Sequence, residues 1–300
     1  MTNIYLESIF MAWESILASK LRSLLTMLGI IIGVGSVITM LAIGQGSKRS
    51  IQAQISEMGS NMIMIHPGGD RRGGVRLDAA DMESLKLKDL EAIQTQARYI
   101  SYISPSVNSS GQAIFGANNT PTTVYGISPE YLDIRRYKVE EGDIFSEQDV
   151  KTAAKVCLVG KSVVDELFPD GESPVGKVIR FGKIPLRIVG VLESKGYNSM
   201  GMDQDDVVLS PYTTVMKRML AVTYLQGIFA SALSEDMTDY ATDEITTILR
   251  RNHKLKENDD DDFTIRSQQE LSTMLNSTTD LMTTLLACIA GISLVVGGIV

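Results

Sequence analysis

The sequence predicts an α+β domain that is attached to a membrane by an apolar helix at each end. Two uncharged apolar runs of helix length, residues 24–43 and 281–300, lie near the two ends of the chain. Between them, segments with the periodicity of strands and of helices alternate. A mixed architecture whose two ends return to the membrane follows from these features.

The first apolar run has the sequence LLTMLGIIIGVGSVITMLAI, and residues 23–47 contain no charged side chain. A helix of this length, at about 1.5 Å per residue, crosses a hydrocarbon core of about 30 Å. The apolar part of a cleaved signal peptide is shorter and begins nearer the N-terminus. We therefore expect a transmembrane helix at 23–46.

The second run, LMTTLLACIAGISLVVGGIV, is also uncharged and reaches the last residue without a polar flank. Membrane helices usually leave the bilayer through Lys, Arg, Trp or Tyr residues. We expect residues 281–300 to be the beginning of a second transmembrane helix that the chain leaves incomplete.

The charges separate the apolar ends from the middle of the chain. Residues 1–46 hold two acidic and two basic side chains and residues 281–300 hold none, so residues 47–280 carry the entire net charge of -8. That composition is typical of a domain that folds in water. A negative net charge argues against a nucleic-acid-binding protein, which needs a basic surface for phosphates.

The segment before the first span has apolar residues at near-helical spacing. It predicts an amphipathic helix at 1–22 on the membrane surface, with Trp13 in the headgroup layer and Lys20 and Arg22 at the interface. A solvated helix that packs on a partner fits the pattern equally well. Basic residues follow the span at Lys48 and Arg49 as well, so the flanking charges leave the orientation open.

Helical periodicity continues after the span through Ile51 and Ile55 to residue 58. A helix over 24–58 would be roughly 50 Å long and would join the membrane to the domain as a rigid stalk, which makes these isoleucines candidate lever positions. Within the span, Gly29, Gly33 and Gly35 permit close helix packing. The alternative is that these glycines are tolerated in a helix that faces lipid.

The water-soluble part shows recognisable strands, helices and turns. Residues 178–192 predict a hairpin whose Gly-Lys loop suits a type II′ turn. The other expected strands are 61–66, 100–107, 112–115, 122–127, 155–160, 223–232 and 263–267, and the expected helices are 81–97, 162–168, a short one after 211, 237–252 and one that starts near 268.

Motifs that would indicate catalysis fail on their context. The run GESPVGKV at 171–178 fits G-x-x-x-x-G-K, but Val178 stands where a P-loop needs Ser or Thr, and a strand follows instead of a helix. We therefore expect no nucleotide site there, and Gly176 to shape the entry to the hairpin.

Metal and nucleophile patterns fail in the same way. His66 and His253 have no HExxH or cysteine cluster nearby, and Ser162 lacks a G-x-S-x-G context. The run at 259–262 lacks the spacing of an EF-hand loop, so it predicts a solvated turn. The sequence predicts no catalytic residue, metal or cofactor. Cys157 is the only cysteine of the soluble part and Cys288 lies in the second run, which excludes a disulfide within that part.

Four longer stretches are more specific, because their order and spacing span the chain. They are LRSLLTMLGIIIGVGSVITMLAIGQGSKRSI, SNMIMIHPG, VGKSVVDELFPDGESPVGKVIRFGKIPLRIVGVLESKG, and DDFTIRSQQEL before LLACIAGISLVVGGIV. Together they resemble the MacB/FtsX-type permeases of bacterial ABC transporters, with their MacB-like periplasmic core domain, over essentially the whole chain.

The resemblance implies a multi-pass protein of the bacterial inner membrane, whose large domain lies on the periplasmic side. The implied parts are a cytoplasmic or interfacial helix at 1–22, a first transmembrane helix at 23–46, a core domain at 47–280 and the start of a second transmembrane helix at 281–300. Within the core domain, a porter-like part at 47–127 and 222–280 would hold an inserted α/β subdomain at about 128–221.

The resemblance also implies a function and partners. Such a permease is a non-catalytic subunit that works as a homodimer with a separate ABC ATPase chain, and with a periplasmic adaptor and an outer-membrane channel in efflux systems. ATP hydrolysis would drive the outer domains through the stalk helices, which is mechanotransmission. The cytoplasmic loop that meets the ATPase would lie beyond Val300. Substrates in the family include macrolides, peptides, toxins and lipoproteins.

Two other function classes remain open at this point. An FtsX-like membrane regulator would control a cell-wall hydrolase or a signalling partner without export. A membrane-tethered enzyme would need a catalytic constellation that the sequence does not offer.

Overall fold

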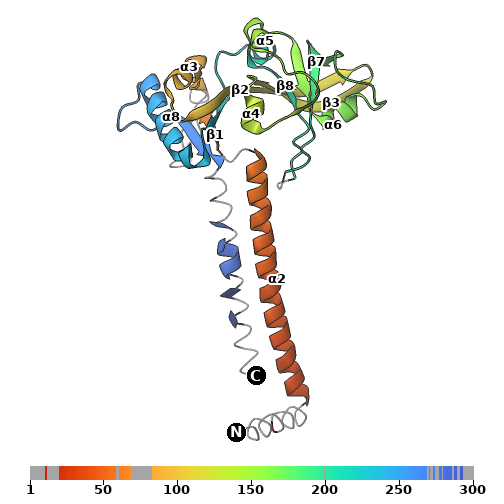
Figure 1. Ribbon diagram of the computed structural model, residues 1–300, viewed down its shortest axis with the longest axis vertical. Helices are drawn as coiled ribbons and strands as arrows, with labels where there is room; N and C mark the ends of the chain where they lie inside the picture. Colours follow the sequence, from red (N-terminus) through yellow and green to blue (C-terminus); the bar gives the residue numbers. More distant parts are fainter. Residues whose placement is uncertain are drawn as a thin grey trace. The chain divides into compact units, whose positions relative to one another are not determined.

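The computed structural model describes residues 20–58, 61–68, 83–198 and 201–268, together with Met11 and residues 270, 273, 277–278, 280–285, 287–288 and 291–292. The chain divides into two compact units, Met1–Gln52 with Thr273–Val300, and Ala53–Ser272. The described residues confirm the α+β fold class (Figure 1).

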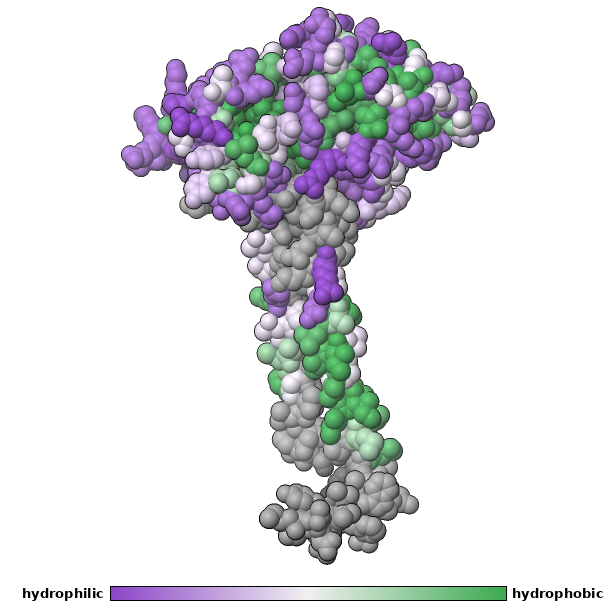
Figure 2. All heavy atoms as spheres, viewed as in Figure 1, coloured by the Kyte–Doolittle hydropathy of each residue, from purple (hydrophilic) through white to green (hydrophobic). Residues whose placement is uncertain are grey.

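The apolar helix is the main described element of the first unit. α2 (Lys20–Met58) is one helix of 39 residues, and its segment Met27–Ser47 is long and apolar enough to cross a membrane, with a mean hydropathy of 2.3. Figure 2 shows apolar side chains along this part of α2. The uninterrupted helix predicted over 24–58 is confirmed. Its sequence contains no proline, which would kink or break a helix.

Two expected membrane elements fall mostly outside the described residues. Of the amphipathic helix expected at 1–22, the structure describes Met11 and the first turn of α2. Of residues 281–300 it describes 281–285, 287–288 and 291–292, all helical. The second span therefore stays a prediction.

The second unit is built on ten described strands. They follow the order β10-β1-β9-β2-β3-β8-β5-β7-β4, with β6 paired to both β2 and β7. β3–β8 and β5–β7 are parallel, and the other pairs are antiparallel. The strands are β1 (Met62–Pro67), β2 (Ile100–Phe115), β3 (Asn118–Ile127), β4 (Val139–Gly142), β5 (Val156–Val159), β6 (Val178–Phe181), β7 (Ile184–Leu192), β8 (Val208–Pro211), β9 (Gly227–Ala232) and β10 (Phe263–Ser267).

One end of the sheet is covered by two helices that lie side by side, α3 (Leu87–Gln96) and α8 (Thr238–His253) (Figure 1). Their apolar faces, with Ile93, Ile245 and Leu249, join Ile63 and Ile65 of β1 in one buried cluster. The 3.6-residue spacing of these side chains explains why helix 237–252 was predictable.

The other end is buried on both faces. In β5 the side chains of Cys157 and Val159 join the large cluster, whereas Val156 and Leu158 join a second one. Alternation places neighbours in a strand on opposite faces, so β5 lies between two apolar layers and reads as a continuous apolar run. α6 (Lys161–Leu167) contributes to the first layer, and α4 (Tyr131–Arg135) and α5 (Glu147–Thr152) contribute to the second.

The prediction of two separate strands at 100–107 and 112–115 is wrong. β2 runs unbroken for 16 residues, and its second half pairs with β3 from Val107↔Gly126 to Phe115↔Asn118. Gly111, in the gap between the two predicted strands, lies where a Cβ would be 2.8 Å from the Phe181 ring. The glycine makes room for a close approach and does not make a turn.

Three boundaries also differ from the expected ones by four residues or more, and one of them is the start of β3 at Asn118 instead of 122. α3 begins at Leu87 instead of 81, because the Lys86 N–H donates to the Asp89 carboxylate at 2.7 Å and caps the helix there. β9 begins at Gly227 instead of 223. Residues 81–82 lie outside the described part.

Several elements had no prediction, namely α4, β4, α5 and β8. The short helix expected after 211 exists, but after α7 (Tyr212–Thr214) it continues as the π-helix η2 (Val215–Leu220). The 3-10 helix η3 (Glu235–Met237) leads into α8. The hairpin β6–β7 matches its prediction, since Gly182 has φ +57° and Lys183 has a negative φ, as a type II′ turn requires.

Candidate functional site

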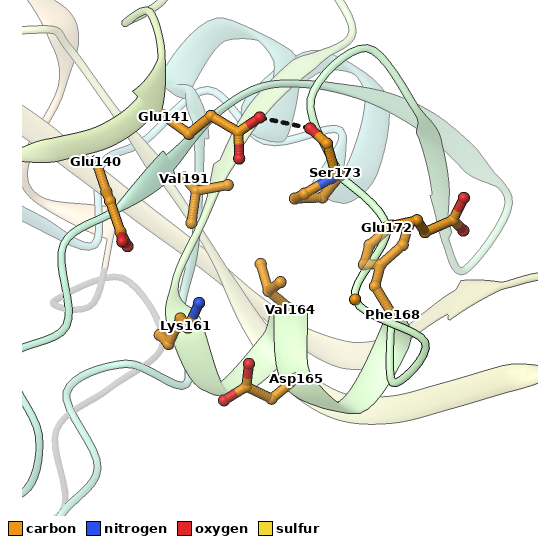
Figure 3. Close-up of a pocket in the computed structure, with 11 residues that line it drawn as sticks. Glu140, Glu141, Lys161, Val164, Asp165, Phe168, Glu172, Ser173 and Val191 are labelled. Carbon is orange, nitrogen blue, oxygen red and sulfur yellow. Dashed lines mark hydrogen bonds between the residues drawn. The ribbon is translucent and has the colours of Figure 1, made fainter.

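A hollow of about 470 Å³ opens between α6, β4 and the turn at 171–174 (Figure 3). Buried apolar side chains of Val164, Phe168 and Val191 form its floor. Its rim is mostly acidic, with the carboxylates of Glu140, Glu141, Asp165 and Glu172 and one amine, that of Lys161.

Some of these rim charges are already engaged. Ser173 donates its hydroxyl proton to Glu141, as Figure 3 shows, and Glu172 pairs with Lys177 at 2.8 Å. The excess of carboxylates disfavours anions such as nucleotide phosphates. This agrees with the expectation that the adjacent G-x-x-x-x-G-K match is not a nucleotide site.

The backbone of that match is used for folding. The Gly176 N–H donates to the Ile188 carbonyl at 2.8 Å, and the Ile188 N–H donates to the Lys177 carbonyl at 2.9 Å. A P-loop needs its N–H groups free for phosphate. Gly176 therefore shapes the entry to the hairpin, as expected.

A buried charged cluster joins α3, α8 and the turn before β10. The Nε2 atom of His253 lies 3.2 Å from Asp89 Oδ1, in ion-pair contact, and its Nδ1 atom lies 2.7 Å from Asp262 Oδ1. Asn252 donates its amide to Asp89 as well. The Asp89 side chain is fully buried and that of His253 almost so.

This environment shifts both ionisations. The carboxylate of Asp89 raises the pKa of His253, burial opposes this, and Asp262 adds to the rise. Burial alone would raise the pKa of Asp89, but the His253 contact and the Lys86 N–H outweigh it, and the pKa is lowered. Both shifts favour the charged pair.

The cluster corrects the interpretation of residues 259–262 as a merely solvated turn. Asp261 forms an ion pair with Arg250 and Asp262 binds His253, while Asp260 is exposed. The described residues contain no group of three or more His, Cys, Asp and Glu side chains arranged to hold a metal ion. The cluster is a structural connection between three segments.

In α2, residues on one face are less exposed than their neighbours. Gly33 is buried and Gly29, Val37, Met40 and Gly44 are half-buried, whereas most other described side chains of the span are exposed. A Cβ on Gly44 would lie 3.0 Å from the Thr283 hydroxyl, so the returning segment packs on this face.

The predicted site residues in and near the apolar helix do not all lie on its packed face. Gly29 and Gly33 lie on the packed face, but Gly35 is exposed and a Cβ there would meet nothing within 4 Å. Ile51 and Ile55 lie in the last turns of α2, and Lys20 and Arg22 in its first turn, with side chains outside the described residues. Trp13 lies outside them altogether. The roles of these residues stay predictions.

Comparisons with known proteins fit this architecture. The family model described as "MacB-like periplasmic core domain" matches residues 23–248. Proteins named "Macrolide export ATP-binding/permease protein MacB" are 34% identical in Syntrophobacter fumaroxidans and 37% identical in Neisseria gonorrhoeae, each over 98% of this chain but only 48% and 44% of their own lengths. The chain thus spans less than half the length of these relatives.

Solved structures give the same result. The periplasmic region of MacB from Actinobacillus actinomycetemcomitans is similar with a TM-score of 0.60 and 25% identity, over 75% of this chain and 97% of that one. The extracellular domain of the ABC-type transporter YknZ from Gram-positive bacteria shares the fold, with a TM-score of 0.55 and 18% identity over 69% of this chain and all of that one.

Proposed function

This chain belongs to the family of MacB-like periplasmic core domains, and from that premise we propose that it is part of the permease subunit of an ABC transporter that drives efflux or extrusion. The subunit itself is non-catalytic, and ATP is hydrolysed by a separate ATPase chain. It resides in the bacterial inner membrane with the core domain of residues 47–280 on the periplasmic side.

The observation that carries the proposal is the match over 23–248, which includes the apolar span and the soluble domain in one family. Because α2 is a single helix from Lys20 to Met58, the span and the stalk are one rigid element. Such an element suits the transmission of motion from a cytoplasmic ATPase to the outer domain.

The chemistry of the span supports mechanotransmission over passage of a substrate through the bilayer. Ionisable residues usually line intramembrane routes for ions and polar substrates. Residues 23–47 contain none, so α2 offers no polar path.

We also infer that the soluble domain has a porter-like part, 47–127 and 222–280, and an inserted α/β subdomain at about 128–221. The second apolar cluster supports this division, because its buried members fall between Ile127 and Leu209. The helices α3 and α8 belong to the other part, with β1, β9 and β10.

The partners in this proposal are a second permease copy, an ABC ATPase, a periplasmic adaptor and an outer-membrane channel. The test is purification of the full-length gene product from its native membranes, followed by identification of the co-purified proteins and measurement of ATP hydrolysis. We expect an ABC ATPase with an adaptor. A cell-wall hydrolase or a histidine kinase without an adaptor would replace the exporter by the FtsX-like regulator.

The lever is tested by a proline in the stalk. An interior proline kinks a helix and costs about 3 kcal/mol, so Ile55→Pro should lower coupled ATPase and export activity while the protein is still expressed. Ile51→Pro should act alike, and Ile55→Ala, which keeps the helix, is the control. Unchanged export in both proline variants would argue against the lever.

A further inference from the structure

The hollow between α6, β4 and the turn at 171–174 combines an apolar floor with a charged rim (Figure 3). The floor side chains Val164, Phe168 and Val191 are exposed by only 8%, 4% and 3%. The volume of about 470 Å³ lies within the range of about 300–1,000 Å³ that is usual for small-ligand sites. The carbon atoms of a ligand would cover an apolar floor of this kind and remove it from water.

The walls of the hollow are held in place by contacts of their own. The Phe168 ring packs on that of Phe115, with ring centroids 4.3 Å apart, which anchors the end of α6. The Gly171 N–H donates to the Phe168 carbonyl at 3.1 Å, and Ser173 donates its hydroxyl proton to Glu141. The second of these bonds joins the turn to β4 at the rim. The hollow is therefore formed before any ligand binds.

The charges at the rim decide which kind of ligand fits. Four carboxylates and one amine, that of Lys161, line it, and the carboxylates of Glu141 and Glu172 are engaged as described above. Glu140 and Asp165 are exposed and form no hydrogen bond or ion pair with the described residues. The negative rim attracts a cation and repels an anion. Because the described residues include no group suited to a metal ion, the cation that fits is an organic one.

An organic cation with an aliphatic stem fits both parts of the hollow. The methylene groups of the stem would lie on the apolar floor and the ammonium groups would reach the carboxylates, as in lysine side chains on protein surfaces. Linear polyamines are built in this way, because methylene chains join their ammonium groups. A compact inorganic cation would leave the floor in water, and a neutral apolar ligand would leave the rim without a partner.

We propose that this hollow is a binding site for linear aliphatic polyamines in their ammonium form, with Glu140 and Asp165 as the carboxylates that pair with the ligand. Lys161 opposes binding, because its amine adds a positive charge to the same rim. The proposal goes beyond the proposed function, since the soluble domain would bind a polyamine in an exporter permease and in an FtsX-like regulator alike.

Calorimetric titration of the detergent-solubilised full chain with spermidine tests the site. The comparison ligand is hexaamminecobalt(III), which carries the same charge as fully protonated spermidine but has no methylene groups. We expect saturable binding of spermidine that is about tenfold tighter than that of hexaamminecobalt(III), a difference that burial of about two methylene groups supplies. Absence of saturable spermidine binding, or equal affinity for the two cations, would overturn the proposal.

Charge substitutions at the rim locate the binding. Glu140→Gln and Asp165→Asn should each weaken spermidine binding by about threefold, as expected for exposed ion pairs, whereas Lys161→Gln should strengthen it by about the same factor. Glu235→Gln removes the same charge at an exposed position of η3 outside the hollow, and it should leave the affinity unchanged. Equal weakening by Glu235→Gln and Glu140→Gln, or weaker binding to Lys161→Gln, would contradict a site in this hollow.

Discussion

The apolar helix α2 and the soluble domain use the same residue types in opposite ways. Ile38 in the span is 62% exposed, whereas Ile188 in β7 is fully buried. Figure 2 shows the same contrast: in the described atoms, apolar side chains cover the span, and hydrophilic side chains dominate the visible surface of the domain. The domain removes its apolar side chains from water by folding, whereas most described apolar side chains of the span stay exposed in the folded chain.

A carboxylate in the domain core should have the largest effect. Ile188→Asp would bury an unpaired charge, or protonate it at a cost of about 5 kcal/mol, which equals the whole stability of many domains. We expect loss of cooperative thermal unfolding by circular dichroism. Val178→Asp, at an exposed position of β6, is the control and should melt near the original temperature. A native-like melt for Ile188→Asp would show that this position is not in a packed core.

The buried charge cluster comes next. His253→Gln leaves Asp89 without its cationic partner, and breaking a buried pair costs about 3–5 kcal/mol. The comparison variant is His66→Gln, because His66 is exposed on β1 and should change the free energy of unfolding little.

The pH dependence of that loss has a definite sign. Because the pKa of His253 is raised by folding, its stabilisation is complete below the unfolded pKa and is lost as pH rises through the folded pKa. The pKa of Asp89 is lowered, so its contribution is lost as pH falls through its folded pKa. Denaturant titrations from acidic to alkaline pH should show that the free energies of unfolding of the unmodified protein and of His253→Gln become equal at alkaline pH. A difference independent of pH would mean that His253 acts through packing alone.

The same substitution in the span should have a smaller and different effect. Ile38 is exposed, so in water Ile38→Asp would change the free energy of unfolding little. At the centre of a membrane helix, however, a carboxylate costs about 2.5–3.5 kcal/mol. We expect a larger fraction of the protein to be released by alkaline extraction of membranes, with Ile38→Val retained. Full retention of Ile38→Asp would argue that the helix does not face lipid there.

Glycine substitutions in α2 should give the smallest effects. Gly44→Ala places a methyl 3.0 Å from the Thr283 hydroxyl, whereas Gly35→Ala meets open space. The first should weaken packing in the membrane unit by about 1 kcal/mol or less, and the second should be neutral or stabilising. Thermal aggregation in detergent would rank the two variants. The opposite order would place the packed face of α2 at Gly35.

Local pattern was enough wherever a segment forms its own contacts. The uncharged run gives α2, the spacing of Ile245, Ile248 and Leu249 gives α8, and the Gly-Lys loop gives the β6–β7 hairpin. The failed G-x-x-x-x-G-K context was also predictable, because the strand that follows it is visible in the sequence.

Other features had no local signal. β2 was predicted as two strands, and the close approach of Phe181 to Gly111 within the unbroken strand cannot be predicted from neighbours in the chain. α4 and α5 were missed because helices this short are defined mainly by what they pack against.

By itself, the sequence determined the long apolar helix and the α+β class, which follow from composition and periodicity, and the family, which follows from the order of four sequence stretches. Only the tertiary structure decided which distant segments meet. It placed Asp89 beside His253 and Asn252, the latter 163 residues away, and brought the rings of Tyr99 and Tyr240 to 5.8 Å from each other. The physical reason is that the pKa of a buried charge and the contacts of an exposed ring depend on neighbours in space, and only folding brings these neighbours together.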